Sequence, residues 1–272
     1  MNITGTRAVA VGVQAELITA ENVTAGYKDK TVWHDANFSV GRGEFVAVIG
    51  PNGAGKTTLF RLLLGLQQPI TGIVKVFGEP PKRGNPRIGY VPQRHVIDSE
   101  TNIEAIELVR LGASGKRWGF NPFSQADRDA AFDALVSVGA KDLAHRPLGV
   151  LSGGELQRIF LAEALVSNPG MLLLDEPLSN LDMRRESDLL HLVDNVVRSR
   201  GVTALLIAHN INPLLPHLDK VIYIANGRVA TGTPDEVLTS ESLTALYGVQ
   251  VEVLRDDKGN VAIIGIEEHL RK

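Results

Sequence analysis

Residues 45–58 read FVAVIGPNGAGKTT, and this stretch decides the fold. It opens with an apolar run that suits one buried strand, and a glycine-rich turn follows. We expect a helix to begin near Gly55 and to end at Gly65. Glycines in such a turn let backbone N–H groups wrap an anion at a helix N-terminus, where the helix dipole favours negative charge. Strand, turn and helix together predict a phosphate-binding loop.

Side chains of this loop supply further nucleotide chemistry. Lys56 can place its charge on the β- and γ-phosphates, and the Thr57 hydroxyl can bind Mg²⁺. The expected ligands of this loop are therefore the phosphates of a nucleotide, together with Mg²⁺. The residues expected to hold the nucleotide here are Gly50, Pro51, Asn52, Gly53, Ala54, Gly55, Lys56, Thr57 and Thr58.

A second apolar run, MLLLDEP at residues 171–177, ends in two carboxylates. Asp175 is expected at the carboxyl end of a buried strand, where α/β sheets bind ligands. We expect Asp175 to hold Mg²⁺ through water. Glu176 can orient and polarise the attacking water as a general base. The same pair could form a simple surface turn, but the phosphate loop favours the catalytic interpretation.

Three more side chains have two possible roles each. Tyr27 could stack on adenine or fill the edge of the core. Gln93 could reach the metal and the water, or cap a turn. His209, at the end of a buried strand, could hydrogen-bond the γ-phosphate or be purely structural.

Strand and helix patterns alternate along the chain, which predicts an α/β fold with a mostly parallel sheet and helices on both faces. Strands are expected at 16–23, 37–40, 45–49, 71–78, 87–93, 171–174, 203–208 and 220–225, and helices at 55–65, 102–111, 127–138, 151–166 and 183–200. The segment 102–148 lacks strand patterns and reads as an inserted helical subdomain. Two strand-like runs around DDKGN at residues 256–260 predict a hairpin.

Composition excludes several classes of protein. The 272 residues include 28 Lys and Arg against 31 Asp and Glu. The chain therefore lacks the surplus of basic residues that is typical of nucleic-acid-binding proteins. The absence of cysteine excludes disulfide frameworks, thiolate zinc sites and cysteine nucleophiles. The seven histidines are scattered without ligand spacing, so no protein-bound transition metal is expected. The apolar runs are too short for a membrane helix, and residues 1–15 read as a loose extension without a signal-peptide pattern. We therefore expect a soluble intracellular protein.

The order of the motifs resembles that of the ATP-binding cassette ATPases. The matching residues are Tyr27 (A-loop), Gly50 to Thr57 (Walker A), Gln93 (Q-loop), Leu151 to Gln157 (signature), Asp175-Glu176 (Walker B), Ser179 to Asp182 (D-loop) and His209 (H-loop). The signature reads LSGGE rather than LSGGQ, and Ser152, Gly153 and Gly154 are intact. Every catalytic position of the family pattern is present, so the resemblance implies an active ATPase.

The resemblance implies a P-loop NTPase-type, mostly parallel sheet with an antiparallel β part and a helical subdomain at about 97–150. The ATPase domain would span 16–246, and a β-hairpin tail would span 247–272. Glu176, His209 and Gln93 would be catalytic, and Mg²⁺ would be held by Thr57, Gln93 and Asp175. Two chains would pair head to tail, with Ser152, Gly153, Gly154 and Asp182 closing over ATP held by the partner. This homodimer would explain why one chain has two helix N-termini suited to binding anions, at the phosphate loop and at the signature, that are far apart in the sequence.

Within this family, three segments resemble the manganese and zinc importer ATPases: 91–98 (VPQRHVID), 117–135 (RWGFNPFSQADRDAAFDAL) and 246–269 (LYGVQVEVLRDDKGNVAIIGIEEH). The resemblance implies an ATPase subunit at the cytoplasmic face of the membrane. It would be attached to separate permease subunits that receive metal from an extracytoplasmic binding protein. The permease contact is expected around Gln93 to Val96 and on the helical subdomain. Alternatives are import of chelated iron or another small nutrient, a soluble cassette protein of translation or DNA repair, and a nucleotide sensor without turnover.

Overall fold

The computed structural model describes residues 16–27, 30–93, 97–98, 100–114, 124–179 and 181–265. The extension predicted at residues 1–15 lies outside this part of the chain. The largest sheet has six strands, in the order β5-β6-β7-β3-β8-β9. They are β3 (Phe45–Ile49), β5 (Ile88–Val91), β6 (Met171–Asp175), β7 (Thr203–Ile207), β8 (Lys220–Ala225) and β9 (Arg228–Gly232). Only β8 and β9 pair antiparallel in this sheet, so the predicted mostly parallel α/β fold is confirmed.

The sheet is buried on both faces because side chains of its strands alternate between two hydrophobic clusters. In β3, Phe45 and Ala47 face one cluster, whereas Val46 and Val48 face the other. The first cluster lies under α4 (Gly153–Leu165) and α5 (Met183–Arg200), and the second lies against α1 (Lys56–Leu63). This packing holds the ends of β3 and α1, and hence the loop between them, in a fixed relation.

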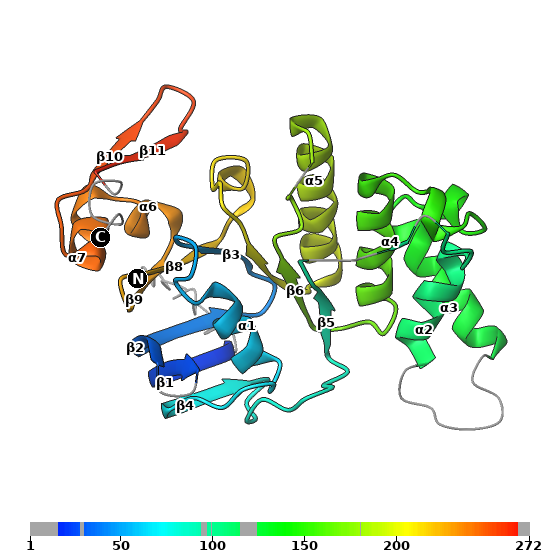
Figure 1. The fold of residues 1–272 in the computed structure, drawn as a ribbon, viewed down its shortest axis with the longest axis horizontal. Helices are drawn as coiled ribbons and strands as arrows, with labels where there is room; N and C mark the ends of the chain where they lie inside the picture. The colour runs from blue at the N-terminus through cyan, green and yellow to red at the C-terminus, as the bar shows by residue number, and fades with distance from the viewer. Residues whose placement is uncertain are drawn as a thin grey trace, which may run out of the picture.

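A three-stranded antiparallel sheet, in the order β2-β1-β4, covers α1 from the other side. Its strands are β1 (Glu16–Tyr27), β2 (Lys30–Gly41) and β4 (Thr71–Val76). Figure 1 shows this blue-to-cyan sheet below the large one, with α1 between them. Strands β1 and β2 are longer than the sequence patterns predicted, because they continue through shifts in register that interrupt the apolar alternation.

The helical part between β5 and β6 contains α2 (Ala105–Ser114), α3 (Gln125–Ser137) and α4, with short 3₁₀ turns at 141–143 and 148–150. Figure 1 places these green helices together on the side of the sheet away from the antiparallel strands. Helix α2 starts at Ala105 rather than at the expected Asn102. The reason is that Glu104 forms a β-bridge with Pro147, which holds the preceding residues in extended backbone.

The C-terminal part carries α6 (Pro234–Val237), α7 (Ser240–Tyr247) and an antiparallel hairpin of β10 (Glu252–Arg255) and β11 (Val261–Ile264). A 3₁₀ turn at 215–217 precedes β8. Strand β9 and helices α6 and α7 were not predicted, because each is short and shows little apolar periodicity. Among the described residues, no helix has the length and apolar character needed to span a membrane.

Candidate active site

The loop from Gly50 to Gly55 connects the central strand β3 to α1. Gly53 and Gly55 both have positive φ, at +78° and +102°, which only glycine adopts without strain. The Ala54 N–H donates to the Pro51 carbonyl at 3.2 Å, closing the turn. Thr57 and Thr58 follow in the first turn of α1. The unpaired N–H groups of this helix start lie at the loop, as an anion site requires.

Two glycines of the loop are also required by close packing. A Cβ on Gly50 would lie 2.0 Å from the Ile224 carbonyl oxygen in β8. A Cβ on Gly55 would lie 2.3 Å from Val32 Cγ1 and 2.8 Å from Trp33 Cδ1 in β2. The fully buried Trp33 also points its Nε1 at the Gly55 carbonyl, 3.4 Å away. Both sheets therefore fix the loop.

Lys56 is buried within this loop. Its Nζ donates to the carbonyls of Gly50, at 2.7 Å, and Pro51, at 3.1 Å. Burial lowers the pKa of Lys56, and the charges of Glu176 and Asp175 partly oppose this effect. The ammonium is thus held by weak neutral partners at the place where phosphate oxygens would be stronger ones.

Asp175 ends β6 and is buried. Burial is the main cause that raises its pKa, and the charge of neighbouring Glu176 raises it further. Tyr90, Lys56 and Arg61 act in the opposite direction and lower it. The Tyr90 hydroxyl in β5 lies 3.5 Å from Asp175 Oδ2. Two adjacent carboxylates near one lysine form an acidic site that suits a cation.

Glu176 brings two of the predicted residues together. Its Oε2 accepts from Gln93 Nε2 at 2.6 Å, and its Oε1 lies 2.9 Å from His209 Nε2. Glu176 has a left-handed backbone, with φ of 51°, which is unusual for a residue with a side chain. The Ser179 hydroxyl donates to the Glu176 carbonyl at 2.9 Å and supports this turn. Side chains that follow β5 and β7 therefore meet at the carboxylate that follows β6.

The signature residues lie at the start of α4. Ser152 is the N-cap: its Oγ accepts from the Glu155 N–H, and Glu155 Oε2 accepts from the Ser152 N–H. The Gln157 side chain donates to the Pro177 carbonyl and so ties α4 to the turn after Glu176. Asp182 is the N-cap of α5, and its Oδ1 accepts from the Arg185 N–H at 3.0 Å.

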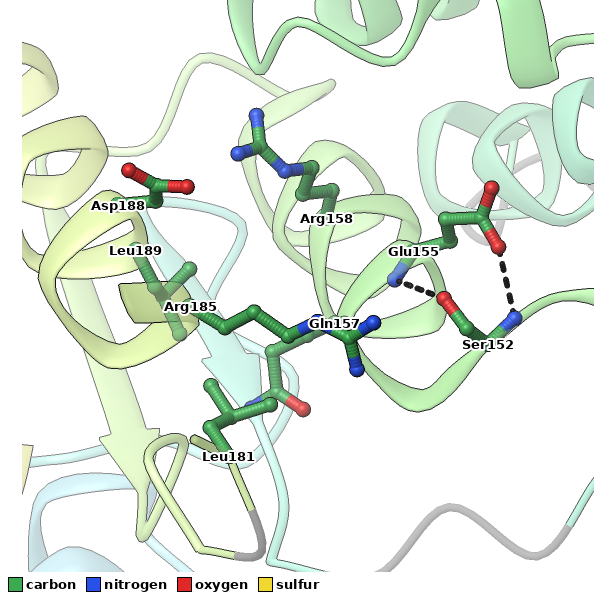
Figure 2. Close-up of a pocket in the computed structure, with 9 residues that line it drawn as sticks. Ser152, Glu155, Gln157, Arg158, Leu181, Arg185, Asp188 and Leu189 are labelled. Atoms are coloured by element: carbon green, nitrogen blue, oxygen red, sulfur yellow. Dashed lines mark hydrogen bonds between the residues drawn. The ribbon is translucent and has the colours of Figure 1, made fainter. Parts of the chain in front are cut away.

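A cavity of about 330 Å³ opens beside the signature (Figure 2). Figure 2 shows the Arg185 side chain reaching from α5 toward the start of α4. A Cβ on Gly154 would lie 3.3 Å from Arg185 Cδ. The lining residues are Ser152, Gly154, Glu155, Gln157, Arg158, Leu181, Arg185, Asp188 and Leu189, and none of them belongs to the phosphate loop.

Tyr27, the other predicted nucleotide residue, ends β1 with 61% of its surface exposed. Sequence reasoning missed Trp33, Tyr90 and Arg185. Apolar alternation in β2 and β5 could suggest that Trp33 and Tyr90 are buried. It could not show that they contact the phosphate loop and Asp175, because these contacts join strands far apart in the chain.

Comparisons with known proteins agree on one family. Residues 33–179 match the family model described as ABC transporter. The manganese transport system ATP-binding protein MntB of Bacillus subtilis is 34% identical, over 88% of this chain and 95% of that protein. A zinc import ATP-binding protein ZnuC, from Hydrogenovibrio crunogenus, is 32% identical over 85% of this chain and 88% of that protein.

Two solved structures share the fold. One is a chain from an ABC transporter in an inward-facing conformation, with a TM-score of 0.78 and 28% identity, covering 92% of this chain and 98% of that chain. The other is the dimeric ATP-binding cassette MJ0796 bound to ADP and Pi, with a TM-score of 0.67 and 27% identity. It covers 79% of this chain and 98% of that chain.

Proposed function

Because this chain belongs to the ABC transporter family and is an ATP-binding ATPase subunit of it, we propose that it powers the import of divalent manganese or zinc through a separate membrane permease. The observation that carries the choice of cargo is the similarity to manganese and zinc transport proteins over 85% or more of this chain. That similarity extends well beyond the short nucleotide motifs, which many ATPases of different function share.

In this proposal the phosphate loop holds the nucleotide and Glu176 serves hydrolysis. The loop N–H groups and Lys56 bind the phosphates, and Tyr27 stacks on adenine. Gln93 and His209 both contact the Glu176 carboxylate, so they can orient it toward the attacking water. Glu176 then accepts a proton from that water as a general base. His209, about half exposed beside it, can also donate to the γ-phosphate.

The residues near Asp175 fit Mg²⁺. The Thr57 hydroxyl, the Gln93 amide and the Asp175 carboxylate offer the oxygen ligands that this ion prefers. Burial and the Glu176 charge raise the Asp175 pKa, which means that a cation there would relieve unfavourable electrostatics. When bound, Mg²⁺ supplies charge neutralisation at the phosphates.

The arrangement of the signature supports a head-to-tail homodimer. Ser152 and Gly154 line a cavity that contains no phosphate-loop residue, and Asp182 lies at the start of α5, next in the chain to the lining residue Leu181. In this proposal a second chain brings its nucleotide to Ser152, Gly153, Gly154 and Asp182. We assign the permease contact to the helical part, which follows Gln93 in the chain. Arg94, His95 and Val96, predicted for the same contact, lie outside the described residues.

This assembly would place the subunit on the cytoplasmic face of the membrane, bound through its permease. An extracytoplasmic metal-binding protein would deliver the ion to the other side. The test is uptake of radioactive manganese and zinc by membrane vesicles that contain the whole transporter. Uptake of either ion that depends on ATP supports the proposal, whereas uptake of only chelated iron or an organic nutrient contradicts it.

Glu176→Gln is the matched control for this assay. The amide keeps the size of the side chain but cannot take a proton, so we expect hydrolysis to fall by about 10²-fold or more. Metal uptake should fall with it. ATP binding, measured separately, should persist because Lys56 and the loop are intact. Loss of ATP binding in this variant would count against the role given to Glu176.

A further inference from the structure

One side chain joins the C-terminal hairpin to the segment that carries His209. Asn212 Nδ2 donates to the Val261 carbonyl at 3.0 Å, and the Val261 N–H donates to Asn212 Oδ1 at 2.7 Å. The asparagine amide thus satisfies both backbone groups of Val261 at the start of β11, as a neighbouring strand would. We call this pair of bonds the Asn212 clamp.

His209 lies between two fixed points of the backbone. Before it, buried Ala208 donates its N–H to the Val48 carbonyl in β3 at 3.3 Å. After it, Ile211 is buried and Asn212 is clamped to β11. His209 and Asn210 between them are exposed, and 51% of the His209 side chain is open to solvent. Because half of the imidazole is exposed, its position depends on the contact with Glu176 and on the backbone on either side of it.

The hairpin is itself anchored to the body of the protein. Val251 and Val261 are buried in the main hydrophobic cluster, and Val253 and Ile263 pack against it. A second clamp holds the residue just before β10. Thr244 Oγ1 accepts from the Val251 N–H at 3.0 Å and donates to the Val251 carbonyl at 3.3 Å. This Thr244 clamp starts from α7 and does not involve the His209 segment.

We propose that Asn212 is a positioning residue for ATP hydrolysis. Through its clamp on Val261, it fixes the backbone that directs His209 toward Glu176. The C-terminal hairpin is then a supporting part of the active site rather than an appendage. The inference rests on the catalytic role proposed above for His209, and the experiment separates the two.

The two clamps give a matched pair of variants. Asn212→Ala removes both bonds to Val261 and frees the His209 segment. Thr244→Val removes both bonds to Val251 with little change in shape and leaves that segment alone. Both should lower thermal stability to a similar extent, since each leaves two backbone groups without their partner. Only Asn212→Ala should change catalysis.

The assembled transporter should be used, with kcat and KM for ATP measured for each variant. We expect Asn212→Ala to lower kcat on the order of tenfold or more while KM stays near the wild-type value, because the catalytic group is misplaced and the phosphate loop is intact. Asn212→Asp retains the acceptor for the Val261 N–H but loses the donor, so its kcat should lie between. Wild-type kcat in Asn212→Ala, or an equal loss of kcat in Thr244→Val, would overturn the inference.

A double-mutant cycle tests the route of the effect. If Asn212 acts through His209, Asn212→Ala should cause no further loss in a His209→Ala background, measured by single-turnover hydrolysis. Additive losses would assign Asn212 a general structural role and overturn the inference. A His209→Ala variant that hydrolyses ATP at the wild-type rate would instead contradict the role proposed for His209. If His209→Ala hydrolyses ATP slowly but Asn212→Ala hydrolyses it at the wild-type rate, only the positioning role of Asn212 is contradicted.

Discussion

Asp175 shows how a binding site can weaken the fold that contains it. Its carboxylate is buried at the end of β6 beside Glu176, and both features raise its pKa. The folded protein therefore binds the Asp175 proton more tightly than the unfolded chain does. As pH rises through the ordinary aspartate pKa toward the raised one, the free energy of unfolding falls. Above that window the loss is complete and constant.

Asp175→Asn should accordingly stabilise the nucleotide-free protein at neutral pH, by on the order of 1 kcal/mol, while abolishing hydrolysis. The amide is neutral and can still accept from Tyr90. Denaturant unfolding at several pH values provides the measurement. The stability difference between variant and wild type should be small below about pH 4 and should grow as the pH rises toward neutrality. A variant that is less stable at neutral pH would refute this account of Asp175.

At the level of residues, the sequence indicated which side chains to consider but not which of them are in contact. The loop, the carboxylate pair and His209 could be singled out because each proposed role requires a particular residue type at a strand end. The meeting of Gln93 and His209 at Glu176 could not be derived from local patterns, because it depends on the order of β5, β6 and β7 in the sheet. Asn212 had no signal at all, since an asparagine after a strand usually marks a turn.

At the level of elements, α3 and α4 begin with the same capping motif. Ser152 with Glu155, and Ser124 with Asp127, each form a reciprocal capping box. The backbone bond from Ser152 holds the Glu155 pKa below its usual value, and Arg146 adds to the effect. The glutamate of LSGGE, Glu155, therefore has a structural role within α4, because it completes the capping box at the start of this helix.

Ser152→Ala and Ser124→Ala should each lower the free energy of unfolding by about 1 kcal/mol, because each removes an N-cap acceptor. Only Ser152→Ala should also lower ATP hydrolysis by the transporter, since Ser152 is proposed to close over the partner's nucleotide. Chemical denaturation and steady-state hydrolysis of both variants make the comparison. Equal hydrolysis in the two variants would leave Ser152 as a helix cap and nothing more.

Sequence was most successful for elements with one strong apolar pattern. Helix α5 was predicted at 183–200 and β3 at 45–49, and both have these bounds. The hairpin of β10 and β11 was also predicted, from its turn sequence, whereas β9, α6 and α7 were missed because tertiary contacts, rather than periodicity, stabilise them. Strand β9 forms by antiparallel pairing along β8, and α6 begins at a Thr233 cap with only a few residues after it. Such elements depend on surfaces that the rest of the fold must first provide.

At the level of the whole molecule, the separation of the two anion sites makes one clear prediction. The chain has no cysteine, so single thiols can be placed without background. Asn52 in the phosphate loop and Val150 before the signature are both exposed. With Asn52→Cys and Val150→Cys in one Glu176→Gln chain, a short thiol crosslinker should give covalent dimers when ATP is added to the assembled transporter.

Either cysteine alone should give almost no dimer, because each thiol would then lack its partner across the interface. The products are distinguished by size under denaturing conditions. A crosslink found only within single chains would show that the phosphate loop and the signature of one chain serve the same nucleotide. That result would overturn the head-to-tail arrangement.

The central position of β3 in the sheet affects how readily this part of the chain opens locally. This strand is hydrogen-bonded on one edge to β7 and on the other to β8, and both faces are covered. Its amides can exchange with heavy water only when the whole sheet opens. The loop proposed to hold ATP therefore follows a strand that we expect to open only with the whole sheet, so little ordering of its backbone should be needed when the nucleotide binds. Local opening at the edges of the sheet should therefore leave the conformation of this loop unchanged.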